Sequence, residues 1–148
     1  SLALMGDITV AARSASLTFV FAPKLGLVPD MGATHFLARR IGEARARALA
    51  LTGRAIGAEE AERIGLVAEC VDDAQLAERS MQVARELAAG PREAFIGVRK
   101  LMASAVRSSL PDQLEAEAVM QARLGDGADF VEGVTAFREK RAPRFGAR

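Results

Sequence analysis

One carboxylate in the first third of the chain stands in an apolar turn. Asp30 follows the segment Leu27-Val28-Pro29 and precedes Met31. Neighbours of this kind predict a partly desolvated carboxylate with few polar partners, and such a group can act as a general base. The chemistry expected at Asp30 is therefore general base catalysis, the removal of a proton from a bound ligand.

The same aspartate has a second interpretation as a helix cap. Residues 31–40 are periodic, with Phe36, Leu37 and Ile41 on one face, which predicts a helix that starts near Gly32. An Asp immediately before a helix is an ordinary N-cap, whose carboxylate accepts hydrogen bonds from the first amides of the helix. Because the two roles compete for the same oxygens, the local sequence leaves both open.

The remaining reactive side chains give weaker signals. His35, the single histidine, is expected to be a surface or packing residue. Cys70, the single cysteine, is expected to be a buried small hydrophobe, since no basic residue adjoins it in sequence to activate a thiolate. One cysteine excludes an intrachain disulfide, and no paired Cys/His cluster predicts a metal site. This usage fits a reducing compartment and predicts a cytoplasmic protein.

A few short strands are expected ahead of a long helical region. Residues 8–12, 17–22 and 66–71 are short apolar segments that predict strands. Glycine, aspartate and proline then mark helix ends: stops at Gly53, Gly65 and Gly90, a cap at Asp72 or Asp73, and starts at Pro91 and Pro111. A last helix is predicted through Phe130, Val134 and Phe137. The class is α/β with too little sheet for an independent domain, so the natural chain is expected to extend upstream of Ser1.

The charge balance gives no sign of a polyanionic or membrane partner. The 148 residues carry 20 basic and 19 acidic side chains, for a net charge of +1, and the seven aromatic residues are all Phe. No basic block is present for nucleic acid, and no apolar run reaches the roughly 18 residues of a membrane-spanning helix. The expected partner is a small molecule or another subunit.

Four motifs in order resemble the enoyl-CoA hydratase/isomerase (crotonase) superfamily. They cover essentially the whole chain and lie at residues 1–15, 24–34, 51–53 with 58–67, and 132–145. The resemblance implies the C-terminal portion of a crotonase-like α/β fold, with residues 1–71 as part of the core and residues 72–148 as a helical oligomerisation region. It also implies a coenzyme A thioester as substrate in fatty acid metabolism, no other cofactor, and a homotrimer or hexamer.

Within that superfamily the position of the carboxylate differs between reactions. By the resemblance, the two glutamates of hydratases fall on Ser1 and Ala22, and no glutamate occurs between Ser1 and Asp30. By the same resemblance, Asp30 occupies the position of the aspartate in isomerase branches. The sequence around Asp30 is most similar to that of the ring-oxepin isomerases of phenylacetate metabolism. The prediction is an acyl-CoA thioester isomerase that shifts a double bond through an enolate, with Asp30 as base.

Two alternatives stay open at this point. One is an enoyl-CoA hydratase, which belongs to the lyases. The other is a truncated, non-catalytic oligomerising fragment, because the backbone donors that hold the oxyanion in this family come from two loops that are not in this sequence.

The last helix carries the expected coenzyme A contacts. The resemblance implies that Phe137 lies against the adenine and Lys140 against the phosphates of coenzyme A bound to a neighbouring subunit. An apolar ring for the base and a cation for phosphate suit those roles. Alternatively, Phe137 continues the apolar stripe of Phe130 and Val134, and Lys140 is a solvated cation at a helix end.

Overall fold

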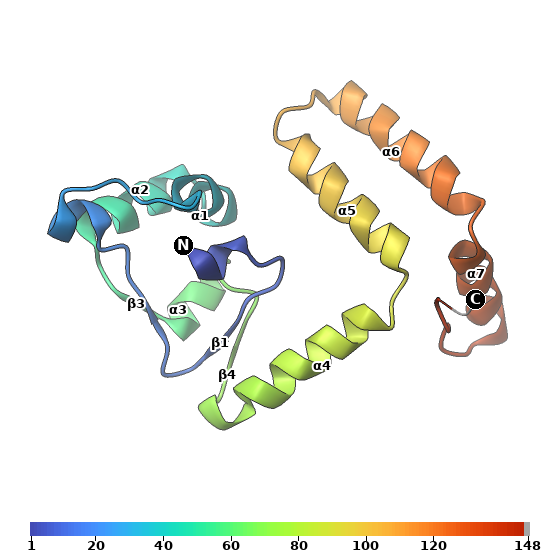
Figure 1. Ribbon diagram of the computed structural model, residues 1–148, viewed down its shortest axis with the longest axis horizontal. Helices are drawn as coiled ribbons and strands as arrows, with labels where there is room; N and C mark the ends of the chain where they lie inside the picture. Colours follow the sequence, from blue (N-terminus) through green and yellow to red (C-terminus); the bar gives the residue numbers. More distant parts are fainter. Residues whose placement is uncertain (147–148) are drawn as a thin grey trace. The chain divides into compact units, whose positions relative to one another are not determined.

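The computed structural model describes residues 1–146 and divides into two compact units. The first unit is Ser1–Met81, and the second begins at Gln82. The sequence placed its boundary between residues 71 and 72, after the last strand, whereas the two units divide within a helix that follows that strand (Figure 1).

The first unit contains the strands and three of the helices. In chain order its elements are η1 (Leu2–Met5), β1 (Val10–Ala12), β2 (Ser16–Leu17), η2 (Phe21–Leu25), α1 (Ala33–Ile41), α2 (Glu43–Thr52), β3 (Ile56–Gly57), α3 (Ala58–Arg63), β4 (Glu69–Val71) and η3 (Asp73–Gln75). The expected α/β class is confirmed, with strands that are shorter than predicted.

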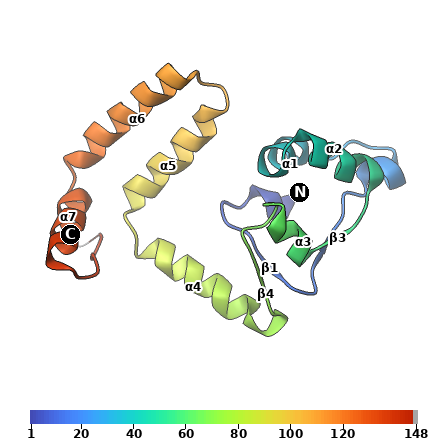
Figure 2. The same cartoon turned by 180° about the vertical axis from the view of Figure 1, so that it is seen from behind.

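Two small sheets join segments that are distant in sequence. β1 pairs in parallel with β4, with Val10 opposite Glu69, and the two run side by side in Figure 2. β2 pairs antiparallel with β3, with Leu17 opposite Ile56. Together these pairings bring the start of the unit against its end.

The strand predicted over residues 17–22 is wrong in its second half. Phe21–Leu25 forms a helical turn, in which the amide of Lys24 donates to the carbonyl of Val20 at 3.1 Å. Pro23 lacks the amide hydrogen that a strand donates to its neighbour, so the helical turn is favoured over a continued strand here. Gly53, at φ 63°, lies so near that a Cβ on it would come within 2.5 Å of Pro23 Cγ.

The predicted cap at Asp72 or Asp73 is also wrong. Neither carboxylate caps the following helix through its side chain. Asp72 Oδ1 instead accepts from Arg13 Nε at 2.8 Å, and Asp73 Oδ1 accepts from the amide of Ser14 at 3.0 Å. Both aspartates therefore fasten the turn after β1, which the linear sequence did not reveal.

The core of the first unit includes the buried face of α1. Its largest fully buried side chains are Leu4, Leu37, Ile56 and Leu66. The predicted helix face is confirmed, since Leu37 and Ile41 are buried and Phe36 packs against them. Apolar burial of this kind contributes about 25 cal/mol for each Å² removed from water.

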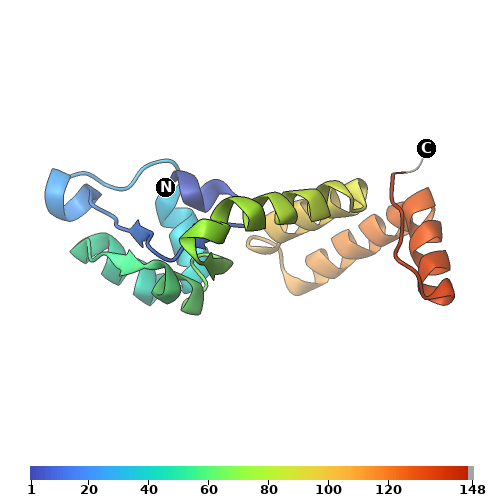
Figure 3. The same cartoon turned by 90° about the horizontal axis from the view of Figure 1, so that it is seen from below.

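The second unit is entirely helical in its described part. It holds the end of α4 (Leu76–Ala88), then α5 (Arg92–Ala105), α6 (Leu110–Gly125) and α7 (Ala128–Glu139); α5 and α6 run side by side in Figures 1 and 3. Pro91 and Pro111 lie at helix starts as predicted, and Ser109 caps α6 by accepting from the amide of Asp112 at 3.3 Å.

This helical unit has almost no buried interior of its own. Among residues 82–146 only Gly97 and Ala136 are buried. Helices draw most of their stability from packing an apolar face, so this unit gains little stability from an interior of its own. Within residues 1–146, no helix combines the length and apolar character required to cross a membrane.

Candidate active-site carboxylate and coenzyme A contacts

Asp30 lies in the connection between η2 and α1. α1 begins with the amide of Ala33 donating to the main-chain carbonyl of Asp30 at 2.9 Å. The N-cap residue is Gly32, at φ 74°, and no side chain caps the helix. Met31 is also left-handed, at φ 51°. The capping interpretation of the Asp30 carboxylate is therefore wrong, because two left-handed residues separate it from the helix.

The expected desolvation of Asp30 is wrong for this chain by itself. Asp30 is exposed, and so are its apolar neighbours: Leu27 is 60% and Val28 is 81% exposed. These side chains lie on the surface of the turn instead of packing around the carboxylate. The turn thus presents an acid beside exposed apolar side chains.

Arg40 fixes α1, the helix after Asp30, to the first residues of the chain. Its Nη2 donates to the carbonyls of Leu4 and Gly6 at 2.9 and 2.6 Å, and its Nη1 donates to the carbonyl of Leu66 at 3.0 Å. Thr9 Oγ1 lies 3.4 Å from the same Nη1. One partly buried guanidinium therefore joins η1, β1 and the turn before β4 to α1.

The two positions that hydratases give to glutamate lie in short helical turns. Ser1 precedes η1, and Ala22 lies within η2. Asp7 and Asp30 are the acidic residues among residues 1–30. Asp7 comes shortly after η1, and Asp30 lies in the connection that follows η2.

His35 and Cys70 lie in ordinary structural settings. The exposed His35 ring meets Phe36 edge to face at 5.5 Å, and its Nε2 lies 3.3 Å from Arg39 Nη1. Cys70 is half-buried, so the expected full burial is wrong. Burial nevertheless raises the pKa of the Cys70 thiol, and Arg13, which pulls the other way, does not reverse the shift. Neither residue has the setting of an activated nucleophile.

The predicted coenzyme A residues lie at the end of α7. Phe137 is 85% exposed, the largest exposure of any large hydrophobic side chain that the structure describes. Lys140 is exposed and ends the helix in the left-handed conformation, at φ 55°. Both side chains are thus accessible to a ligand. Asp30 belongs to the first unit and these two residues to the second.

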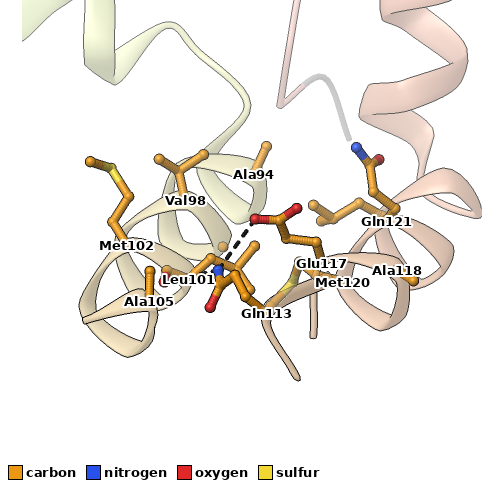
Figure 4. A pocket seen from close by; sticks show the side chains of 12 residues that line it. Ala94, Val98, Leu101, Met102, Ala105, Gln113, Glu117, Ala118, Met120 and Gln121 are labelled. Carbon is orange, nitrogen blue, oxygen red and sulfur yellow. Dashed lines mark hydrogen bonds between the residues drawn. The ribbon is translucent and has the colours of Figure 1, made fainter. Parts of the chain in front are cut away.

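A groove of about 560 Å³ runs between α5 and α6. Figure 4 shows Val98 and Met102 from α5 opposite Glu117 and Gln121 from α6, with Gln113 donating to Glu117 at 3.3 Å. Its lining is mainly apolar and includes no histidine or cysteine. In the part of the chain that is described, no cluster of three or more metal-binding side chains occurs.

Comparison with known proteins decides the family. The family model for enoyl-CoA hydratase/isomerase matches residues 1–148. The chain belongs to the enoyl-CoA hydratase/isomerase family. The resemblance inferred from the four motifs is confirmed, and so is the crotonase-like fold. An enoyl-CoA hydratase of Bacillus anthracis, known from a crystal structure, superposes with a TM-score of 0.91 at 33% identity, over 99% of this chain and 57% of that one.

The relatives of this enoyl-CoA hydratase/isomerase family member bear both names. A probable enoyl-CoA hydratase of Rhodobacter capsulatus is 45% identical over 148 residues, which are 100% of this chain and 57% of the relative. The 1,2-epoxyphenylacetyl-CoA isomerase of Escherichia coli is 44% identical over 145 residues, which are 98% of this chain and 55% of the relative. The chain spans little more than half the length of these relatives, and overall identity does not separate the two reactions.

Two residues of structural importance to these sites were missed from the sequence. Arg40 donates mainly to main-chain carbonyls, and Glu132 accepts from the Arg141 side chain and from the amide of Arg144. A side chain that binds main-chain groups cannot be recognised from the types of the residues it binds, because nearly every residue has these groups. Glu132 lies inside the last motif, so its place in the motif was the one available signal.

Proposed function

We propose that this chain carries the base of an acyl-CoA thioester isomerase, which shifts a double bond through an enolate. The observation that supports this most directly is the carboxylate of Asp30, which is exposed and is not used to cap α1. The places of the two hydratase glutamates hold Ser1 and Ala22. One carboxylate is sufficient for a double-bond shift, whereas hydration also requires that water be activated.

Asp30 would act twice in one turnover. The carboxylate removes a proton from C2 of a 3-enoyl thioester, and the electron pair of that C–H bond moves into a dienolate. The protonated Asp30 then returns the proton at C4, which leaves the double bond between C2 and C3. A positioned base of this kind is worth about 10²- to 10⁴-fold in rate, and each donor to the oxyanion about 3 to 4 kcal/mol. No metal or redox step is needed.

Phe137 and Lys140 are the residues proposed to hold coenzyme A. An exposed ring beside an exposed cation suits an adenine next to a phosphate, and both lie within one turn of the end of α7. The test is coenzyme A affinity, measured by titration calorimetry. Lys140→Ala is expected to weaken binding, and unchanged affinity would remove Lys140 from the site.

Further copies of the same chain are the proposed macromolecular partner, in a trimer or hexamer. Residues 82–146 bury only Gly97 and Ala136, while the α5–α6 groove leaves Val98 and Met102 at 53% and 66% exposure. Covering these side chains would supply the apolar burial that the helical unit lacks. A cytoplasmic location remains a prediction from cysteine usage.

An assay of two proteins separates the three possible functions. One is this chain, and the other is a fusion in which the part of the Rhodobacter capsulatus relative that precedes the matched region stands before Ser1. Conversion of 3-enoyl to conjugated 2-enoyl thioesters, followed by absorbance, supports the isomerase. Loss of the 2-enoyl absorbance with water added identifies a hydratase, the alternative that the Rhodobacter capsulatus name favours. Inactivity of both proteins identifies an oligomerising fragment.

A further inference from the structure

The segment after α7 folds back along the helix that precedes it. α7 closes with the amide of Lys140 donating to Phe137 O at 3.2 Å and that of Arg141 donating to Ala136 O at 3.1 Å. The left-handed conformation that reverses the chain falls on Lys140, although glycine is the usual residue there. A side chain of this size in that conformation requires support from its surroundings.

Glu132 supplies that support from two turns earlier in the helix. Its carboxylate accepts from Arg141 Nη1 at 2.6 Å and Nη2 at 3.0 Å, and from the amide of Arg144 at 2.8 Å. We call these three residues the Glu132 clasp. Paired, two-point contacts between guanidinium and carboxylate are among the stronger hydrogen bonds in proteins, and the Glu132 side chain is only 24% exposed.

Two further contacts hold the same segment against α7. Asp129 Oδ1 accepts from the amide of Gly146 at 3.2 Å. The ring of Phe145 lies over Gly133, with its Cε1 3.8 Å from the position that a Cβ on Gly133 would occupy. Figure 3 shows the returning segment beside α7 at the C-terminal end of the described chain. These contacts thus fix the turn at Lys140 by joining α7, which precedes it, to the segment that follows it.

We propose that Glu132 is a positioning residue for coenzyme A: through the clasp it holds Lys140, beside the exposed ring of Phe137, in the conformation that meets the phosphates. This inference rests on the proposed function, which places coenzyme A at Phe137 and Lys140. A binding residue whose backbone is already fixed loses less conformational entropy when the ligand arrives. Glu132 itself does not touch the ligand.

Glu132 carries the wrong charge for a phosphate site, and this makes the proposal testable by the direction of an effect. If only charge mattered, removal of an acid near the phosphates would strengthen the binding of coenzyme A. If Glu132 positions Lys140, its removal weakens binding despite the more favourable charge.

Glu139 offers a matched control on the same helix. It accepts one hydrogen bond from Arg141 Nε at 2.6 Å, whereas Glu132 accepts two from Arg141 and a third from the amide of Arg144. Glu139→Gln and Glu132→Gln each remove one negative charge and replace one of the two acceptor oxygens with an NH2 group. Only Glu132→Gln releases Arg144 and the paired contact with Arg141.

The experiment is calorimetric titration of the full chain with coenzyme A at fixed ionic strength. Glu132→Gln is expected to bind about tenfold or more weakly, whereas Glu139→Gln binds as tightly as the wild type or more tightly. Hydrogen exchange at the amides of Arg144 and Gly146 reports whether the clasp has opened. If Glu132→Gln fails to fold, the shorter Glu132→Asp, which cannot reach both groups, takes its place.

Each result has one meaning. Coenzyme A affinity in Glu132→Gln that equals or exceeds that of the wild type, with the clasp amides exchanging faster, overturns the positioning role and leaves the proposed function intact. A wild-type chain that does not bind coenzyme A removes the site at Phe137 and Lys140 itself, and the positioning role with it.

Discussion

The amide of Ala33 donates a hydrogen bond to the main-chain carbonyl of Asp30 at 2.9 Å, and the carboxylate of Asp30 does not cap the helix. The carboxylate of an aspartate before a helix ordinarily accepts hydrogen bonds from the first amides of that helix. Here Gly32 caps α1 without a side chain, so the acid is available for chemistry. This separation of backbone and carboxylate roles underlies the proposed isomerase.

The stability of the chain should therefore be insensitive to the acid at position 30. Asp30→Ala is expected to change the free energy of unfolding by less than about 0.5 kcal/mol, as other exposed substitutions do. Ser109→Ala, which removes the capping bond to Asp112, should cost about 1 kcal/mol. Urea unfolding followed by circular dichroism measures both. A loss for Asp30→Ala as large as that for Ser109→Ala would mean that the carboxylate caps α1 after all.

Arg40 should be among the costliest polar residues to replace in the first unit. Arg40→Met keeps much of the stem but leaves three carbonyls without their donor: the partly buried ones of Leu4 and Leu66 and the exposed one of Gly6. The expected cost is about 2 kcal/mol or more, because buried acceptors lose their partners. Arg45→Met, on the exposed surface of α2, is the control and should change stability by less than about 0.5 kcal/mol. Equal midpoints for the two variants would contradict the anchoring role.

The helical unit should associate through the groove between α5 and α6. Val98→Glu places a charge on the lining of the groove and is expected to reduce the oligomer to smaller species, since a buried unpaired charge is costly. Lys100→Glu, on the same helix but outside the lining, should leave the mass unchanged. Light scattering during size exclusion gives the masses. The groove is not the interface if both variants keep the wild-type mass.

The clasp should survive well into acid. The hydrogen bonds from Arg141 and, next, from the amide of Arg144 lower the pKa of Glu132 from 4.5 to about 2. A carboxyl whose pKa is lower in the folded state stabilises that state above its unfolded pKa and loses the contribution as pH falls through the folded value. The clasp is therefore complete above pH 4.5 and lost toward pH 2. A ¹³C titration of the Glu132 carboxyl measures this, and a midpoint near 4.5 would show that the clasp does not form.

Local chemistry made parts of this fold predictable. Pro91, Pro111 and Gly53 each act within a single turn of helix, so the sequence located the helix ends that they define. The order of four motifs identified the family, which composition did not. It also drew attention to Asp30, Phe137 and Lys140, whose proposed roles rest on the resemblance and on their accessibility.

Long-range contacts account for most of what was missed. β1 pairs with β4 across nearly sixty residues, and Asp72 and Asp73 bind Arg13 and Ser14 instead of capping a helix. Arg40 is defined by main-chain carbonyls, which every residue possesses, and Glu132 pairs with Arg141 nine residues along the chain. The exposure of Leu27 and Val28 depends on what packs over the turn, and no local pattern reveals that.

The most direct test of the central claim is the isomerisation rate of Asp30→Asn, measured beside the wild type in the fusion with the Rhodobacter capsulatus segment. Asn keeps the shape of Asp but cannot accept a proton from C2. The account predicts a fall in kcat of about 10²- to 10⁴-fold, with an unchanged circular dichroism spectrum. An Asp30→Asn protein that isomerises 3-enoyl thioesters at the full wild-type rate would contradict it.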